Sequence, residues 1–285
     1  MKYLNLKNVG WLILVLKISL VVFLGLQVMQ NPESFSQFSF DSTFSFFVIA
    51  GFIAQMIDGA LGMAYGVSCS SLLMGFGVPP KVASASIHTS EVFTTGVSGL
   101  SHIFMKNVDK HLFIRLVIPG VIGSATGAYL LSDILDGKIF KPYISGYLLI
   151  LGIFILVKSF RKVQPFNGIK YVSVLGLTGG FFDAIGGGGW GPIVTSNIIN
   201  QGKHPKETIG TVNTAEFFIT YVSTGIFLFF VGIDSWKVVL GLLAGGVIAA
   251  PIGAMLVSRI KPKTIMFLVG LVIIITSCYN IYKSI

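Results

Sequence analysis

The sequence predicts an all-α polytopic membrane protein made of two inverted repeats. Each repeat is a broken, re-entrant helical hairpin plus three transmembrane helices, and an extra span precedes the first repeat. Three observations predict this fold. The chain of 285 residues is 53% hydrophobic and only 11% charged, whereas an ordinary soluble domain has about 25% charged residues. Long apolar runs cover most of the chain, and two of them are interrupted by an acid that is followed by glycines.

These two interruptions repeat each other in sequence. Residues 56–70 read MIDGALGMAYGVSCS and residues 181–195 read FFDAIGGGGWGPIVT. A helix that is broken inside the bilayer is tolerated only where it lines a protein-enclosed cavity, as in transporters. The sequence therefore predicts that the two breaks face one central site. The aligned pairs are Asp58 with Asp183, Gly62 with Gly187, Tyr65 with Trp190, and Gly66 with Gly191.

The first half begins with a span at residues 10–29 that contains Lys17, followed by a polar loop at 31–41. Residues 43–77 form an apolar stretch that is too long for one crossing of a hydrocarbon core about 30 Å thick. We therefore expect a hairpin of two helical legs with the break at its tip. Pro80 suits the first turn of the next helix. The remaining spans of this half are expected at residues 81–105, 115–131 and 140–158.

The second half repeats this order, with a hairpin at residues 171–200. Its three spans are expected at residues 207–230, 236–257 and 264–282. The pairing of the two halves extends into the helix after each hairpin, where Glu91 matches Glu216. The expected domains are the amino-terminal span and external loop (1–43), the first repeat (44–160), a basic cytoplasmic linker (161–170) and the second repeat (171–285).

The basic residues indicate the orientation. If the linker is cytoplasmic, most of the 20 Lys and Arg residues fall on the cytoplasmic side, as the positive-inside rule requires. The amino terminus is then cytoplasmic and the carboxyl terminus external. Each repeat makes an odd number of crossings, so the two repeats are expected to be inverted.

Composition excludes several other classes. The net charge of +9 comes from loop residues, so we expect no nucleic-acid partner. The two cysteines, Cys69 and Cys278, lie in apolar segments and indicate neither a disulfide framework nor a metal site. Residues 186–191 lack the Gly-Lys-Ser/Thr that completes a nucleotide loop. We find no nucleophile–base spacing and no metal-ligand spacing on a single element. We therefore expect no enzyme activity, no catalytic residues, no cofactor and no metal.

Four acids lie deep in apolar sequence: Asp58, Glu91, Asp183 and Glu216. A charged carboxylate at the bilayer centre costs at least about 2.5–3.5 kcal/mol. Glu91 lies about 15 Å into its span, where no helix end needs a cap, so Glu91 and Glu216 are predicted to couple transport to protons. Asp58 and Asp183 have two equally favoured roles, as caps of the following half-helices or as members of the site.

The glycines allow the backbone to approach a ligand closely, and half-helix N-termini attract anions. We therefore predict an anion held by amide groups and hydroxyls, with at least one acid neutral when the anion is bound. For each Ser and Thr, helix packing is the alternative role, and for His88 a helix contact competes with a proton-carrying role. The predicted substrate-binding residues are Asp58, Gly59, Gly62, Tyr65, Gly66, Ser70, His88, Thr89, Ser90, Asp183, Gly187, Gly188, Gly189, Trp190, Thr195, Asn213 and Thr214.

These residues carry a resemblance to a known family. The two Asp–Gly breaks, the Pro-Lys-led helices with Thr89–Glu91 and Thr214–Glu216, and the duplicated layout resemble the sulfite exporter TauE/SafE family of membrane anion permeases. The resemblance covers residues 44–282. It implies a secondary transporter of a sulfur-containing anion, such as sulfite or an organosulfonate, in the bacterial inner membrane. The first break is less glycine-rich than the second, so the two halves are expected to contribute unequally.

One other function stays open at this point. The acids and His88 would also suit a proton- or sodium-coupled permease of a cation or metal ion. The expected partners are a small anionic substrate, the lipid bilayer and a coupling proton or Na⁺, and a homo-oligomer is an open alternative. The sequence does not distinguish import from export.

Overall fold

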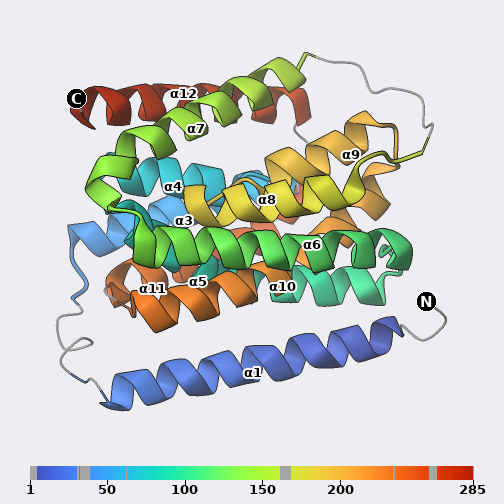
Figure 1. The fold of residues 1–285 in the computed structure, drawn as a ribbon, viewed down its shortest axis with the longest axis horizontal. Helices are drawn as coiled ribbons and strands as arrows, with labels where there is room; N and C mark the ends of the chain where they lie inside the picture. The colour runs from blue at the N-terminus through green and yellow to red at the C-terminus, as the bar shows by residue number, and fades with distance from the viewer. Residues whose placement is uncertain are drawn as a thin grey trace.

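The computed structural model of the chain describes residues 5–30, 32, 39–61, 63–160, 168–233, 235–256 and 262–284. Within these ranges every regular element is a helix (Figure 1). Gly62, much of the loop after the first span, and residues 161–167 of the predicted linker lie outside the described residues. In chain order the elements are α1 (Leu6–Gln30), α3 (Ser42–Leu61), α4 (Tyr65–Gly75), α5 (Pro80–Phe104), α6 (Lys110–Tyr129), the π-helical turn η1 (Leu130–Ile134), α7 (Gly137–Lys158), α8 (Val172–Gly186), the π-helical turn η2 (Gly191–Thr195), α9 (Ser196–Asn200), α10 (Pro205–Phe230), α11 (Trp236–Leu256) and α12 (Pro262–Ser284).

Five helices are long and apolar enough to cross a membrane: α1, α6 with η1, α7, α10 and α12. α5 has 25 residues, close to the 26 of α10, but its buried face carries Ser84, His88 and Glu91, which lower its hydropathy. A polar stripe inside a bundle is typical of a helix that serves a site rather than one that faces lipid. The prediction of an all-helical, membrane-embedded protein is confirmed.

Both broken segments fold back on themselves. The rings of Phe46 in α3 and Phe76 after α4 stack with centroids 4.3 Å apart, so the second leg returns to the end where the first leg begins. In the other half, the backbone N–H of Lys170 donates to Gln201 Oε1 at 2.7 Å. α4 has 11 residues, or about 16 Å of helix, which cannot cross a hydrocarbon core about 30 Å thick.

Two ion pairs define the opposite ends of the bundle. Lys237 Nζ lies 2.8 Å from Asp41 Oδ2 at the end where α3 begins, and Lys203 Nζ lies 2.7 Å from Asp109 Oδ2 at the other. We call these the Lys237 end and the Lys203 end. α5 runs from the Lys237 end to the Lys203 end, and α10 runs in the opposite direction.

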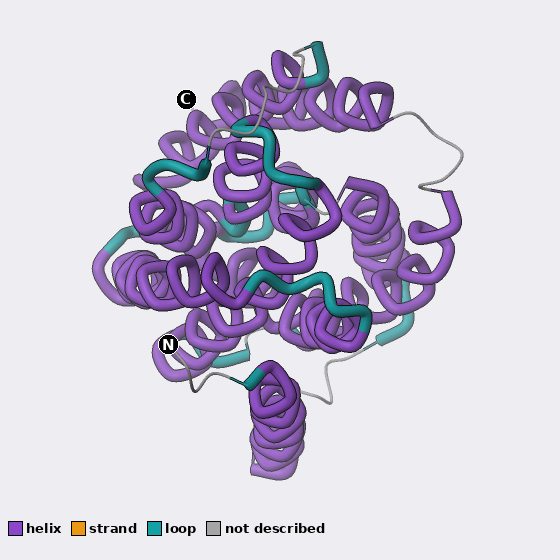
Figure 2. The backbone as a smooth tube through the Cα atoms, turned by 90° about the vertical axis from the view of Figure 1, so that its right-hand side faces the viewer, coloured by secondary structure: helices purple, strands orange, loops and turns teal. Residues whose placement is uncertain are grey.

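Each hairpin packs mainly on a helix of the other half. α3 lies along α11, α8 lies along α6, and α5 packs on α10 between them (Figure 1). Glycines bring these backbones close: a Cβ atom at Gly51 would lie 2.4 Å from Leu242 O, and one at Gly176 would lie 2.8 Å from Leu116 O. Such contacts are typical of small residues in membrane helices. α7 and α12 pair on one flank, and α1 lies on the opposite flank, where it packs mainly on α5 (Figures 1 and 2).

Candidate functional site

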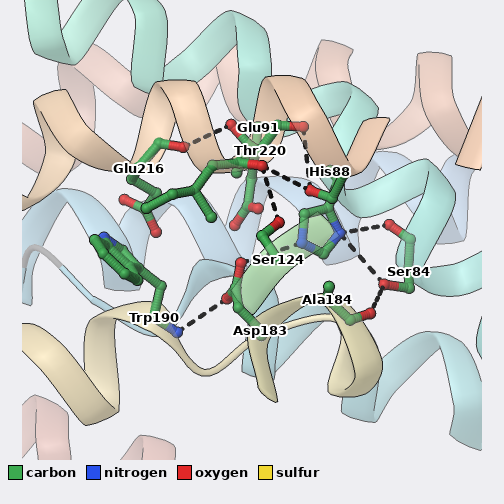
Figure 3. Close-up of polar contacts among 12 residues, drawn as sticks. Ser84, His88, Glu91, Ser124, Asp183, Ala184, Trp190, Glu216 and Thr220 are labelled. Carbon is green, nitrogen blue, oxygen red and sulfur yellow. Dashed lines mark hydrogen bonds and ion pairs between the residues drawn. The ribbon is translucent and has the colours of Figure 1, made fainter. Parts of the chain in front are cut away.

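The four deep acids come together in the centre of the bundle, each from a different helix. Glu91 of α5 lies close enough to Asp183 of α8 for the two carboxyl groups to interact electrostatically. Glu216 of α10 interacts in the same way with Asp58 of α3. Each neighbouring pair therefore joins one half of the chain to the other. Glu91 and Asp183 are buried, and Glu91 Oε2 has no hydrogen-bond partner within the described structure. Figure 3 shows Glu91 and His88 approaching Asp183 from α5.

His88 and Asp183 share a proton. His88 Nε2 lies 3.1 Å from Asp183 Oδ2, and both side chains are buried. His88 Nδ1 lies 2.8 Å from the backbone O of Ser84, and because a carbonyl only accepts, Nδ1 carries a hydrogen. A proton must then lie between Nε2 and Oδ2, since two bare acceptors would repel each other. The pair is therefore neutral overall, either as imidazolium and carboxylate or as imidazole and carboxylic acid.

The second oxygen of Asp183 bridges the break in its own hairpin. Oδ1 accepts the backbone N–H of Trp190 at 2.9 Å, and Asp58 accepts the backbone N–H of Tyr65 in the same way. Both acids lie in the last turn of the first leg, slightly before the break where the sequence placed them. Asp183 thus caps the second leg and also contacts His88. The first amide of each second leg is already bonded to its Asp, rather than being free for an anion as we expected.

The two breaks touch each other through glycine backbone. A Cβ atom at Gly66 would lie 2.6 Å from Gly187 O, and one at Gly188 would lie 2.1 Å from Val67 N. Gly187 has φ +66°, a conformation that favours glycine. Ser70 Oγ donates across this contact to Gly186 O at 2.5 Å. A ligand could enter between the breaks only if they separate.

Most of the predicted hydroxyl groups bond within their own helix. Thr89 donates to Ala85 O at 2.7 Å, Ser90 to Ser86 O at 2.9 Å and Thr214 to Gly210 O at 2.7 Å. These bonds fit the packing role that the sequence left open for them. Thr195 Oγ1 and Ser68 Oγ differ, because they are buried with no hydrogen-bond partner among the described residues.

Asn213 and Trp190, two further predicted residues, are each held by a hydrogen bond from the side chain. Asn213, the counterpart of His88, donates to Ser98 Oγ at 3.1 Å. Trp190 is fully buried, and its indole N–H donates to Val212 O at 3.2 Å. Gly59 lies in the last turn of α3, whereas Gly62 lies outside the described residues.

Two residues of the centre were missed by the sequence reading. Ser84 accepts the His88 ring N–H through its carbonyl, and its hydroxyl donates to Ala184 O at 2.6 Å. Its position one turn before His88 is the signal that could have identified it. Tyr147 of α7 donates from Oη to Gly188 O at 3.2 Å. The residues that align between the two halves end before α7, so the repeat gives no indication of this role.

Two ion pairs of Lys203 join the segments at the Lys203 end of the bundle. Lys203 bonds Asp109 and also lies 3.2 Å from Glu207 Oε2, while the backbone N–H of Asp109 donates to Thr211 Oγ1 at 2.9 Å. Partial burial disfavours the Asp109 carboxylate, but hydrogen bonds from Lys203 and from the start of α6 outweigh this effect. The pKa of Asp109 therefore lies below its ordinary value of 3.8.

The Lys237 end has a narrow cleft at the corresponding place. It lies between the first turns of α5, the end of α10 and the start of α11, and it reaches Thr89. Its accessible volume of about 10 Å³ is on the order of one water molecule. The two ends of the bundle thus differ in this structure.

Three side chains of the centre also match the chemistry of metal ligands. His88, Glu91 and Asp183 each offer one ligand atom, and these atoms lie within 4.8 Å of one another. One imidazole nitrogen and two carboxylates suit a divalent transition metal. The hydrogen bond from Nδ1 to Ser84 leaves Nε2 as the ligand atom.

The model of the sulfite exporter TauE/SafE family matches residues 47–280. The chain belongs to this family. It is 46% identical over 248 residues to the probable membrane transporter protein YtnM of Bacillus subtilis, covering 84% of this chain and 82% of that protein. It is 24% identical over 277 residues to the probable membrane transporter protein YunE of the same species, covering 85% and 99%. A probable membrane transporter protein of Haemophilus influenzae is 25% identical over 228 residues, covering 76% and 85%. No solved structure matches the chain.

Membership of the TauE/SafE family confirms the resemblance seen in the sequence. It identifies a membrane transporter rather than an enzyme. The matched region contains all four acids, His88 and both breaks, whereas α1 lies before it. The centre described above therefore belongs to the part of the chain that the family shares.

Proposed function

We propose that this chain is a secondary transporter of a small sulfur-containing anion, such as sulfite or an organosulfonate, in the bacterial inner membrane. The contact between His88 of the first half and Asp183 of the second half carries the proposal. It places a proton at the junction of two parts of the chain, so movement of one half against the other would change the environment of that proton. The substrate class is suggested by the description of the TauE/SafE family.

In this mechanism the halves are inverted repeats that expose one central site to each side in turn. The ion pairs at the Lys203 end and the cleft at the Lys237 end support this idea. We assign the Lys203 end to the cytoplasm, because basic residues gather in its loops, including Lys106, Lys110, Lys170 and Lys206. α1 then starts in the cytoplasm and α12 ends outside.

The substrate binds when the two glycine breaks move apart. Separation frees the amides around Gly188 and Gly66, and it lets the unpaired hydroxyl groups of Thr195 and Ser68 donate to the anion. An anion beside four carboxyl groups requires that some of them be protonated. Glu91 and Glu216 take protons in this step, and the neutral His88–Asp183 pair adds no net negative charge.

Radiolabelled sulfite flux in proteoliposomes, with and without an imposed pH gradient, tests the proposal. We expect flux that follows the gradient and is lost in Glu91→Gln and in Glu216→Gln. Asp133→Asn, which changes an exposed acid in η1, is the matched control and should transport like the wild type. Unchanged rates and pH response in both Glu variants would refute the proton-linked mechanism.

A second function, a permease for a divalent cation, is favoured by one observation. The ligand atoms of His88, Glu91 and Asp183 lie close enough together to hold a metal ion. Uptake of a labelled divalent ion by the same proteoliposomes, without sulfite or organosulfonate flux, would support this function and exclude the anion carrier.

A further inference from the structure

A groove lies beside the contact of α1 with the rest of the bundle, at the Lys203 end. It lies between the first half of α1, the last turns of α5 and the start of α6, with a volume of about 730 Å³. Leu14, Leu100 and Phe104 are among the apolar side chains that line it, whereas Lys7, Lys106 and Lys110 lie at its polar end. The groove thus has an apolar floor and a cationic mouth, and no acid is among its described lining residues.

The turn that carries Lys106 has an unusual backbone. Lys106 has φ +57°, the left-handed region that favours glycine. α5 ends there in a Schellman motif, in which the N–H of Asn107 donates to His102 O at 2.9 Å and the N–H of Lys106 donates to Ile103 O at 3.1 Å. In the equivalent turn of the second half, the residue with a positive φ is Gly232. A lysine therefore occupies a position where glycine would adopt the backbone conformation at a lower cost in free energy. This points to a use for the ammonium group of Lys106.

We propose that this groove binds an anionic phospholipid of the surrounding bilayer. The phosphate lies among the three ammonium groups, and an acyl chain lies along the apolar floor between α1 and α5. Basic pockets between membrane helices have this preference. Trp11, one turn after Lys7 and 68% exposed, fits the headgroup region where Trp is enriched.

The bound lipid would hold α1 against the helices of the site. α1 lies before the region that the family model matches, and it packs on the bundle through Val9, Ile13 and Leu20. Lys17 Nζ donates to Phe93 O of α5 at 3.4 Å, and Ser19 Oγ lies 2.8 Å from Tyr221 Oη of α10. A lipid in the groove would add contacts between α1 and α5 near the Lys203 end. The inference concerns binding and does not depend on what the protein transports.

Native mass spectrometry of the purified full chain tests it. The protein is titrated with phosphatidylglycerol and with phosphatidylcholine of the same acyl chains. We expect tighter binding of phosphatidylglycerol, weakened by about fivefold in each of Lys7→Gln, Lys106→Gln and Lys110→Gln. Lys170→Gln changes a lysine at the same end but outside the groove, so it should bind as the wild type does.

Lys106→Gly distinguishes a loss of lipid binding from a loss of stability. Glycine removes the ammonium group but suits the left-handed turn, so this variant should bind phosphatidylglycerol less tightly while its thermal stability is kept or raised. Equal affinity for the two lipids, or unchanged binding by the triple Gln variant, would overturn the proposal. It would also be overturned by a dimer that forms without lipid and dissociates in the triple variant, because a second copy would then occupy the groove.

Discussion

His88 Nε2 and Asp183 Oδ2 lie 3.1 Å apart in the core of the bundle, and a single proton joins the two halves of the chain there. The His88 ring is fixed from its other side by Ser84, and the Asp183 carboxylate is fixed by Trp190. Neither partner can move without breaking a second hydrogen bond. The pair is therefore a rigid link, and its proton changes position only when the helices that carry it move.

Asp183→Asn should preserve the fold but remove this proton. The Asn side chain still accepts from Trp190 N–H and donates to His88, so we expect a loss of about 1 kcal/mol or less in the free energy of unfolding. Substrate flux should lose its response to an imposed pH gradient. Asp183→Ala is the contrasting variant, because it leaves buried groups unsatisfied at about 1–3 kcal/mol each. A gradient response in Asp183→Asn equal to that of the wild type would contradict the prediction.

Gly188→Ala should destabilise the protein. The added Cβ would lie 2.1 Å from Val67 N and 2.3 Å from Gly66 C, so the two breaks must separate, at a cost of about 1–3 kcal/mol or more. Gly225→Ala in α10 is the control, because nothing lies within 4 Å of its Cβ and Ala favours a helix over Gly by roughly 0.5–1 kcal/mol. Thermal unfolding in detergent should shift in opposite directions for the two variants. A similar midpoint for both would mean that the breaks do not touch as described.

Asp109→Asn should loosen the Lys203 end. Asn keeps the cap that Asp109 provides to the amides of His111 and Leu112, but it loses the charge that holds Lys203. A partly exposed ion pair contributes about 0.2–1 kcal/mol, so the closed state should open a fewfold more often. The measurement uses Thr214→Cys in a Cys278→Ser background. It is the rate at which the introduced thiol reacts with an impermeant thiol reagent. An unchanged rate would show that this ion pair does not close the end.

The same pair predicts a pH effect on stability. The pKa of Asp109 in the folded chain lies below the ordinary value of 3.8. Its stabilising contribution is therefore fully present above about pH 4, and it is lost as the pH falls through the lowered pKa. The unfolding midpoint of the wild type should drop more steeply than that of Asp109→Asn below pH 4. Parallel curves for the two proteins would contradict this assignment.

Several helix boundaries could be predicted because they have a local cause in the sequence. Pro80 and Pro205 start α5 and α10, and Gly187, with φ +66°, caps the end of α8. The proximity of the four acids also followed from the repeat. These features depend on composition, spacing and bilayer thickness, all of which can be read along the chain.

The pairing of side chains across the halves could not be predicted in this way. His88 and Asp183 are 95 positions apart, and only packing of α5 on α8 reveals that they share a proton. The direct contact of Gly66 with Gly187 depends on how two hairpins cross. Tyr147 lies beyond the part of the two halves that can be aligned, so the repeat that revealed the acids did not point to this residue.

Tyr147→Phe should therefore affect the second break alone. The substitution removes the hydrogen bond to Gly188 O but keeps the ring, which stacks on Phe182 with centroids 5.1 Å apart. We expect a loss of about 0.5–1.5 kcal/mol in the free energy of unfolding, together with altered substrate flux, because the backbone of Gly188 is no longer held. Tyr143→Phe, on an exposed position of the same helix, should change neither quantity. If the two variants behaved alike in both unfolding and flux, Tyr147 would have no role beyond packing, and the second break would be held by Asp183 without help from α7.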